Sequence, residues 1–314
     1  MLSVIIPAYN VNKYICECID SLIFIEDIEI IVVDDGSVQD LSFVRNKYNC
    51  FENFKYYKKA NGGLSSARNY GIKKANEPYV MFLDGDDFID TEKLIKTIKF
   101  IKVTNEDVYY FKYVKYFDKS KIFINEKKYA YDFNECISIE DKTFVKDIFE
   151  MVAWRYIIKR EIILSNNLFF FEGIYHEDEE WTPRLLISVD KIYNLKEYIL
   201  FYRQRENSIM RSLKYKNIID VFKIINILEE HSKSLYSDYK IKFIRNRILT
   251  LYKGILFTIH KTKLTTEEKR TVIEELKLKK KNIMFDTKLK NRLVKFCPLD
   301  ILLFLTKIIN TKTF

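Results

Sequence analysis

The segment YVMFLDGDD, residues 79–87, joins a run of apolar residues to a cluster of carboxylates. Its first five residues have the length and composition of a buried strand, and three aspartates follow around a single glycine, Gly85. Carboxylates crowded at the end of a strand repel one another, and a bound cation relieves that repulsion. The segment therefore predicts a core strand whose end carries a functional site.

The first hundred residues alternate between strand-like and helix-like patterns. The strand-like runs are LSVIIPA (2–8), IEIIVVDD (28–35), NFKYYKK (53–59) and YVMFLD (79–84), and helical spacing appears in NKYICECIDSLIF (12–24) and LSSARNYGIKKA (64–75). Continuous apolar strands that alternate with amphipathic helices are typical of a parallel sheet covered on both faces. We therefore predict a doubly wound α/β domain, whose ligands bind where the carboxyl ends of the strands meet the loops.

Beyond residue 105 the pattern changes twice. Residues 107–133 indicate a smaller, more antiparallel patch of strands, and from Lys214 onward the apolar residues recur at helical spacing. We therefore predict a domain at residues 1–213, with halves 1–105 and 106–213. A C-terminal helical region follows at residues 214–314.

The composition is that of a folded protein, with 48% hydrophobic residues in a chain of 314. The net charge is +9, and from Lys261 onward 14 Lys and Arg stand against 6 Asp and Glu. Basic residues are not interleaved with aromatic ones over a recognisable module, so we expect no nucleic-acid partner. The basic C-terminal region fits an anionic membrane surface; the alternatives are packing onto the rest of the chain or a homo-oligomer contact.

The five cysteines are scattered and lack CxxC spacing, which predicts reduced thiols rather than disulfides or a zinc site. The first residues, MLSVIIPAYN, have no basic segment and are interrupted by Pro7, and no run of about 18 apolar residues follows. We therefore expect a cytoplasmic protein. Of the alternatives for its basic region, contact with an anionic membrane would place the protein at the inner face of the cell membrane.

Two acidic clusters follow strand-like runs. Asp34 and Asp35 precede Gly-Ser, a pattern that is also common in ordinary turns. Asp84 and Asp86, on either side of Gly85, can direct both carboxylates at one hard cation. Because the chain has only three histidines and no cysteine pair, we expect Mg²⁺ or Mn²⁺ bound by oxygen, with water and substrate phosphates as further ligands.

The segment NGGLSSARN, residues 61–69, places two glycines before a helix. Small residues at a helix N-terminus suit an anion, and Arg68, one turn in, can pair with a phosphate or an acid. An ordinary capped helix is the equally compatible alternative.

Four segments, in this order and at these separations, resemble the family 2 glycosyltransferases of the GT-A fold: SVIIPAYN, EIIVVDDGSVQD, NGGLSSARNYGI and FLDGDD. The resemblance implies a Rossmann-like sheet and an inverting transfer of a sugar from a nucleotide diphosphate sugar to an acceptor hydroxyl. These motifs cover about the first 90 residues, and YHEDEEWTPRLL and YRQRENSIMRS extend the resemblance to about Ser212.

The resemblance also implies roles on the nucleotide side. Pro7 and Tyr9 border the nucleobase, Asp35 accepts the base N–H, and Asp34 supports the loop. Arg68 orients the acids and the nucleotide.

By the same resemblance, Asp84 lies near the ribose and the metal, Asp86 is the metal ligand, and Asp87 caps the following turn. The segment that closes over the diphosphate supplies Arg203 and Ser208, with Arg205 and Arg211 as further partners.

On the acceptor side, the resemblance assigns the general base to Asp178, beside Glu177. The alternative is that these residues only form an acidic helix N-terminus favoured by the helix dipole. Trp154, Trp181 and Glu177 are candidates for a wall around the sugar or the acceptor, although Trp154 is equally compatible with core packing.

The resemblance favours a UDP sugar, and hence a hexosyl- or N-acetylhexosaminyltransferase. It also favours a lipid-linked saccharide acceptor in the synthesis of capsule, lipooligosaccharide or a similar bacterial surface polysaccharide. The alternatives are an inactive or regulatory nucleotide-sugar-binding relative and a sugar nucleotidyltransferase. The basic Gly-rich loop of a nucleotidyltransferase does not follow the first strand, and neither does the G-x-G-x-x-G of a dinucleotide-dependent oxidoreductase.

Overall fold

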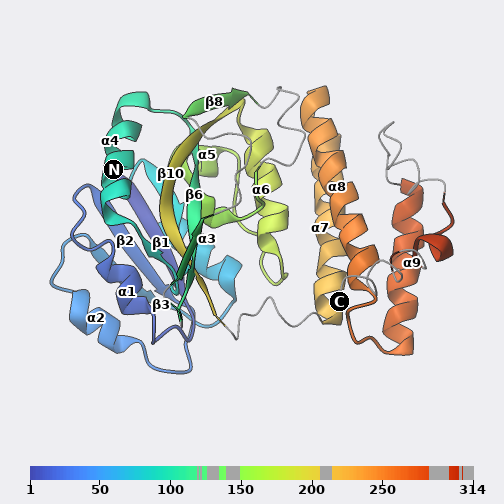
Figure 1. The fold of residues 1–314 in the computed structure, drawn as a ribbon, viewed down its shortest axis with the longest axis horizontal. Helices are drawn as coiled ribbons and strands as arrows, with labels where there is room; N and C mark the ends of the chain where they lie inside the picture. Colours follow the sequence, from blue (N-terminus) through green and yellow to red (C-terminus); the bar gives the residue numbers. More distant parts are fainter. Residues whose placement is uncertain are drawn as a thin grey trace.

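In the computed structural model, helices cover both faces of one large sheet, and further helices pack beyond one of these faces (Figure 1). The structure describes residues 1–118, 120, 122–125, 134–138, 149–205, 214–282, 297–303 and 306. Among them the strands are β1 (Leu2–Ala8), β2 (Ile28–Asp34), β3 (Phe54–Lys58), β4 (Tyr79–Phe82), β5 (Phe88–Ile89), β6 (Val108–Phe117), β7 (Ile122–Asn125), β8 (Glu135–Ser138), β9 (Tyr156–Lys159) and β10 (Lys191–Gln204).

The helices of the same residues are α1 (Ile15–Asp20), α2 (Ser42–Tyr48), α3 (Leu64–Lys74), α4 (Thr91–Thr104), α5 (Arg160–Ser165), α6 (Glu177–Ser188), α7 (Tyr215–Lys233), α8 (Asp238–Thr258) and α9 (Thr266–Asn282). A short 3-10 helix, η2 (Ala153–Arg155), precedes β9.

The strands are ordered β3-β2-β1-β4-β9-β6-β10-β5 across the sheet. Strands β3, β2, β1 and β4 are parallel, as are β6 and β10. Strand β9 runs antiparallel between β4 and β6, while β5, β7 and β8 pair antiparallel with β10 or β6. The predicted doubly wound α/β fold is confirmed, with an antiparallel part that extends beyond the predicted patch.

Alternating residues of the strands build a core on each face of the sheet. In β1, Ile5 contributes to one core, and Val4 and Ile6 contribute to the other. Helices α1, α2 and α4 cover the second face, whereas α3, α5 and α6 cover the first. Both faces are buried, which explains why the strands are continuously apolar.

Helix α3 approaches β1 closely at Gly71. A Cβ at this position would lie 2.3 Å from Cγ2 of Ile5, closer than any ordinary contact. The absence of a side chain therefore sets the distance between α3 and the sheet.

The C-terminal helices α7, α8 and α9 pack on the side of α6 that faces away from the sheet, and they extend the same core (Figure 1). In α9, Val272 and Leu276 are fully buried within this core, and Lys279 pairs with Glu229 of α7 at 2.5 Å. The apolar side of α9 is thus covered by the chain itself. None of the helices that the structure describes is long and apolar enough to cross a bilayer.

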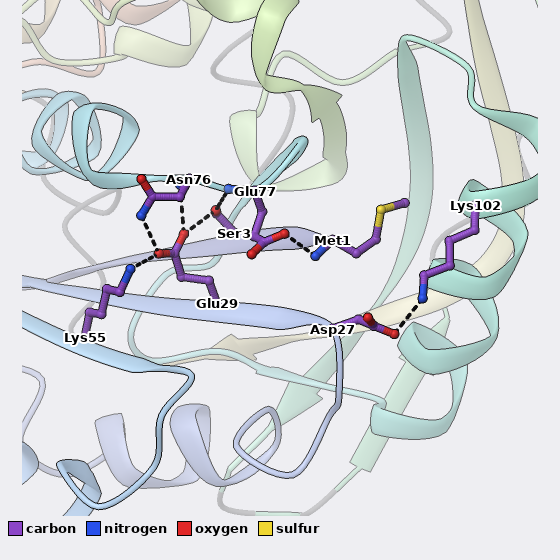
Figure 2. A network of polar contacts seen from close by, with 8 residues as sticks. All are labelled: Met1, Ser3, Asp27, Glu29, Lys55, Asn76, Glu77 and Lys102. Atoms are coloured by element: carbon purple, nitrogen blue, oxygen red, sulfur yellow. Dashed lines mark hydrogen bonds and ion pairs between the residues drawn. The ribbon is translucent and has the colours of Figure 1, made fainter.

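A network of polar contacts links the amino ends of the strands (Figure 2). Glu29 accepts hydrogen bonds from Ser3 Oγ at 2.6 Å and from the backbone N–H of Asn76 at 3.0 Å, and it also pairs with Lys55. Lys102 pairs with Asp27 at 2.6 Å, and the Met1 amine pairs with Glu77. Each of these three carboxylates therefore has a cation of its own.

Candidate active site

The carboxyl ends of β1 and β4 lie side by side. The Leu83 N–H donates to the Ile5 carbonyl, which extends their pairing to the start of the acidic segment. At Gly85, a Cβ would lie 3.2 Å from the Pro7 carbonyl oxygen and from Cγ2 of Val11. Gly85 thus lets the acidic segment pass close to the end of β1.

The acids that follow β2 organise the neighbouring loops. Asp34 is fully buried and accepts hydrogen bonds from the Ser37 N–H and the Tyr56 hydroxyl, each at 2.9 Å. Its contacts match the implied role in supporting the loop. Because the side chain has no exposed surface, it does not offer a direct contact to a nucleotide.

Asp35 receives its donors from the loop that leads into α3. Lys59 Nζ lies 2.6 Å from Asp35 Oδ1, and the N–H groups of Gly62 and Gly63 donate to the carboxylate at distances down to 2.7 Å. Gly63 has φ of 87°, a conformation that favours glycine. Asp35 therefore fixes the glycine pair at the start of α3.

Arg68 joins the two halves of the site. Its guanidinium binds Asp84 at 3.1 Å, and Glu177 and Asp178 at 2.9 Å each. Its side chain is 1% exposed and lies over the ring of Phe170, 5.1 Å from the centroid. One buried cation thus holds carboxylates from the end of β4 and from the start of α6.

The surroundings of Arg68 explain its charge state. Burial alone lowers the pKa of the guanidinium, but the charges of Asp178, Asp84 and Glu177 more than offset this and raise the pKa above its usual value. Arg68 is therefore a permanent cation.

Asp178 has the properties of a proton acceptor near neutral pH. Burial is the main cause that raises the pKa of its carboxyl to about 7, and the charges of Glu177 and Asp84 add to this effect, while Arg68 opposes it. The side chain is 18% exposed, so a small molecule can reach it. A carboxylate with such a pKa is suited to general base catalysis.

The start of α6 brings Glu177 and Asp178 to this position. His176 precedes the helix with φ of 63° and ψ of 37°, a left-handed conformation that turns the chain sharply. Four acidic residues occupy the first helical turn, where the helix dipole stabilises negative charge.

The remaining acids of the β4 loop have different surroundings. Asp86 pairs with Arg205, and burial, followed by the charge of Asp84, raises the pKa of Asp86. Asp87 is 1% exposed, and its Oδ1 accepts a hydrogen bond from the Arg203 backbone N–H at 2.8 Å. Asp87 therefore attaches the acidic loop to β10 and does not cap the following turn, as the sequence had suggested.

A comparison with known families matches residues 3–166 to the family described as glycosyl transferase family 2. The chain belongs to this family. It is a transferase that acts on sugars.

Two curated relatives extend the match. GlyG, a glycosyltransferase of Streptococcus pneumoniae serotype 4, is 27% identical over 314 residues, which cover 93% of this chain and 98% of GlyG. EpsJ of Bacillus subtilis, an uncharacterized glycosyltransferase, is 30% identical over 229 residues, which cover 70% of this chain and 65% of EpsJ. The chain thus spans a little under two thirds of EpsJ but nearly all of GlyG.

The fold also matches a solved structure. Residues 1–349 of S. aureus TarS, in complex with UDP-GlcNAc, superpose with a TM-score of 0.77 at 20% identity, covering 100% of this chain and 92% of the TarS chain. At this identity the similarity shows a shared fold, which is the GT-A fold that the sequence predicts.

Two of the predicted site residues make their contacts within the protein. Arg203 is 2% exposed, and all three of its guanidinium nitrogens bond to protein: to Glu17 at 2.6 Å, to the Asp86 carbonyl at 2.8 Å and to Asp118. It therefore holds α1 and the end of β6 together. Arg205 is the arginine that reaches the carboxylate of Asp86.

The second of these residues is Trp181. This side chain is fully buried, stacks on Phe170 with centroids 4.6 Å apart, and donates from Nε1 to the Leu168 carbonyl at 2.9 Å. No face of the ring is left for a sugar, because α6 directs it into the core.

The other predicted residues vary in accessibility. Tyr9 is 47% exposed just beyond β1, whereas Pro7 is buried within the strand. Trp154 is 6% exposed and stacks on Tyr202, with centroids 5.2 Å apart. Ser208, like Arg211, lies outside the described residues.

Sequence reasoning missed Lys59 and Tyr202. Lys59 neutralises Asp35, and its position just before the Gly62-Gly63 pair was a usable signal. Burial and the nearby charges of Asp87, Asp84 and Asp86 raise the pKa of Tyr202 to about 12, so its hydroxyl stays protonated beside the acidic loop. Nothing in the local sequence distinguishes Tyr202 from the chain's other tyrosines.

The acidic loop suits a hard divalent cation. Asp84 and Asp86 offer carboxylate oxygens. Burial, followed by the charge of Asp84, raises the pKa of Asp86, and a bound cation would favour its ionised form. No group of three or more His, Cys, Asp or Glu among the residues described here could hold a metal alone. Water and substrate oxygens would therefore complete the shell of Mg²⁺ or Mn²⁺.

Proposed function

We propose that the chain is an inverting, metal-dependent glycosyltransferase that moves a sugar from a UDP sugar to a hydroxyl of a saccharide acceptor. The observation that carries this proposal is the guanidinium of Arg68, which binds Asp84 at 3.1 Å and Asp178 at 2.9 Å. The acid expected near the donor and the acid expected near the acceptor are thereby held around one cation. Transfer by a single displacement needs a base and a leaving group on opposite sides of one carbon, and a site that brings both acids together supports it.

Asp178 is the proposed base. It accepts the proton of the acceptor hydroxyl, whose oxygen forms a bond to the anomeric carbon as the bond from that carbon to the diphosphate breaks. The diphosphate leaves with the electron pair of the broken bond, and the configuration at the carbon inverts. The pKa of about 7 for Asp178 supports this role, since the carboxylate is both present and basic near neutral pH.

The donor is proposed to be a UDP sugar. TarS was solved with UDP-GlcNAc and with UDP, and its fold covers the whole of this chain. The exposed ring of Tyr9 offers a face for the base, and Asp35 lies just beyond the end of β2. A hexose or N-acetylhexosamine is the transferred group that we propose.

Asp86, supported by Asp84, would hold Mg²⁺ or Mn²⁺. The bound ion would neutralise the charge of the departing diphosphate. Arg205, 32% exposed and paired with Asp86, would lie beside this charge. Arg68 keeps the carboxylates oriented and, being 1% exposed, remains fixed during transfer.

The acceptor is proposed to be a lipid-linked saccharide in the synthesis of a bacterial surface polysaccharide. The support is the basic C-terminal region, in which 14 Lys and Arg from Lys261 onward stand against 6 Asp and Glu. An anionic leaflet attracts such a region, which would hold the enzyme near its acceptor at the inner face of the membrane. The membrane contact rests on this charge, because the apolar residues Val272 and Leu276 of α9 are buried.

The test measures release of UDP from a panel of UDP sugars with Mn²⁺, with and without saccharide acceptors. We expect Asp178→Asn to lower turnover about 10³-fold, with UDP-sugar binding unchanged, since the variant keeps the shape but cannot accept the proton. Asp190→Asn is the matched control, because Asp190 follows α6 and its side chain is 95% exposed. Full turnover by Asp178→Asn would exclude Asp178 as the base.

The same assay distinguishes the alternatives. Binding of a UDP sugar without release of UDP under any condition would indicate a regulatory relative. In a parallel reaction supplied with UTP and a sugar 1-phosphate, release of pyrophosphate would indicate a nucleotidyltransferase. Loss of turnover with a chelator, restored by Mn²⁺ or Mg²⁺, is the expected result for metal dependence.

A further inference from the structure

The first turns of α7 hold the segment that leads into α6. Asp220 Oδ2 accepts a hydrogen bond from the Tyr175 backbone N–H at 3.0 Å, and Lys216 Nζ donates to the Gly173 carbonyl at 2.9 Å. Lys216 also pairs with Asp220 at 2.5 Å. The backbone of this segment is therefore attached to α7 at two points.

Asp220 is a buried carboxylate, which is unusual in a helix whose role is only to pack against the core. Its side chain is fully buried, and Lys223 also pairs with it, at 2.8 Å. Burial raises the pKa of this carboxyl, but the hydrogen bonds from Lys216, Lys223 and the Tyr175 N–H outweigh burial and lower it below its ordinary value. A charged acceptor is thus kept in the core, where it bonds to the backbone of another element.

His176, which follows Tyr175, has a strained backbone conformation. His176 has φ of 63°, a conformation that costs about 1–3 kcal/mol for a residue other than glycine unless its surroundings fix it. Nδ2 of Asn217, again from α7, lies 3.3 Å from His176 Nε2. The bend that directs Glu177 and Asp178 at Arg68 is therefore supported from α7.

Helix α8 adds a contact on the other side of the proposed base. Arg247 pairs with Glu179, the residue after Asp178. The C-terminal helices thus contact the chain both before and after the residue that has to meet the acceptor hydroxyl.

We propose that Asp220 is a positioning residue for sugar transfer, which fixes the Asp178 carboxylate by holding the backbone at Tyr175. This inference rests on the proposed function, since it assigns Asp220 a task in that reaction. The C-terminal helical region then belongs to the catalytic machinery, because it sets the direction of the base. A displacement of about 1 Å at a reacting group can lower a rate by about 100-fold, so an attachment of this kind has a measurable effect.

The experiment compares three variants of the full chain for UDP release from UDP-GlcNAc. Asp220→Ala removes the acceptor of the Tyr175 N–H, whereas Asp220→Asn keeps an oxygen for it. Glu229→Gln is the matched control, because it breaks another ion pair of α7, the one with Lys279, far from the held segment in sequence. We expect Asp220→Ala to lower kcat about 10- to 100-fold with KM changed less than about 2-fold, and the other two variants to keep most of kcat.

Unchanged kcat in Asp220→Ala, or an equal fall in Glu229→Gln, would overturn the inference, because the role of α7 would then be packing alone. If Asp220→Ala does not fold, Lys216→Ala replaces it; Lys216 is half exposed, and this variant removes the bond to Gly173. We then expect a smaller fall in kcat, again with KM unchanged, and wild-type kcat would count against the inference.

Hydrogen exchange separates this inference from the proposed function. The amides of residues 175–179 are expected to exchange faster in Asp220→Ala than in Glu229→Gln. If the wild-type chain releases no UDP from any donor, the proposed function fails, yet this comparison still reports whether Asp220 holds the segment. Equal exchange in the two variants would exclude such holding.

Discussion

Charged side chains are arranged differently at the amino ends of the strands, called here the amino-end edge of the sheet, and at their carboxyl ends, the carboxyl-end edge. At the amino-end edge, Asp27, Glu29 and Glu77 each pair with a cation of their own (Figure 2). At the carboxyl-end edge, carboxylates outnumber the cations that contact them in the described part of the chain: Arg68 serves Asp84, Glu177 and Asp178, Arg205 serves Asp86, and the side chain of Asp87 bonds to a backbone N–H.

The charges at the amino-end edge therefore contribute mainly to stability, and those at the carboxyl-end edge to function. Paired charges at the amino-end edge join the starts of the strands and leave little net charge. At the carboxyl-end edge, burial and the neighbouring carboxylates raise the pKa of Asp178 and Asp86. The excess of carboxylates there costs stability and would be offset by a bound cation. Substitutions that change one edge at a time test this division.

The largest effect is expected for Arg68→Met. The change leaves three carboxylates without their shared cation, so we expect a loss of about 3 kcal/mol in the free energy of unfolding and the loss of UDP release. Urea unfolding measures the first and the turnover assay the second. Lys55→Met at the opposite edge is the control and should cost less than about 1 kcal/mol, since Ser3 and Asn76 still bond Glu29. Equal losses would contradict the comparison.

Glu29→Gln should cost about 2 kcal/mol at pH 7, because it replaces a buried acceptor of several hydrogen bonds. On balance, the contacts with Lys55, Ser3 and Asn76 outweigh burial and lower the pKa of Glu29 below its ordinary value of 4.5. The ionised form therefore stabilises the fold above that value, and this contribution is lost as the pH falls through the lower pKa of the folded state. The cost of Glu29→Gln should shrink in acid; a cost that is constant with pH would count against this prediction.

Asp87→Asn should stabilise the fold, whereas Glu29→Gln destabilises it. Burial and the charges of Asp86 and Asp84 raise the pKa of Asp87 well above its ordinary value of 3.8. Ionisation therefore favours the unfolded state, and the wild-type fold loses stability as the pH rises above about 4. We expect the variant to be more stable by about 1 kcal/mol at pH 8 and no more stable at pH 4, as measured by thermal unfolding at both values. A variant less stable than wild type at pH 8 would contradict the prediction.

The smallest effect concerns the pH profile. The kcat/KM for UDP release should rise with pH through about 7, since Asp178 acts as a base only when ionised. Glu177→Gln removes a negative charge that raises the pKa of Asp178, so the rising limb should move to lower pH by less than about one unit. A rise in kcat/KM that occurs at higher pH in Glu177→Gln, or that shifts by the same amount in Glu29→Gln, would exclude this explanation.

The parallel part of the fold could be predicted because its information is local. Each of the strands β1, β2 and β4 is a short apolar run followed within two residues by a turn residue or an acid, namely Asn10, Asp35 and Asp84, so the strand ends and the acidic clusters were visible together. Strand β9 was missed, because three apolar residues and a lysine between a 3-10 helix and α5 do not distinguish a strand from a helix.

The contacts of the other predicted site residues depend on partners far away in the sequence. Arg203 and Arg205 are two residues apart, yet one bonds to Glu17 and Asp118 and the other to Asp86. Trp181 lies on the same helix as Asp178, but no local pattern indicates that its ring packs on Phe170. Such assignments require the tertiary structure, because they depend on which elements meet.

The close approach of α3 to β1 at Gly71 has a consequence for how members of this family can diverge. Arg68 lies one turn before Gly71 on the same helix, so the depth at which the guanidinium meets its three acids depends on a position without a side chain. A methyl group there would push α3 outward from Ile5 and carry Arg68 with it, although every charged residue of the site would be unchanged. A relative that keeps all the acids but has replaced this glycine should therefore not be assumed to keep the reaction.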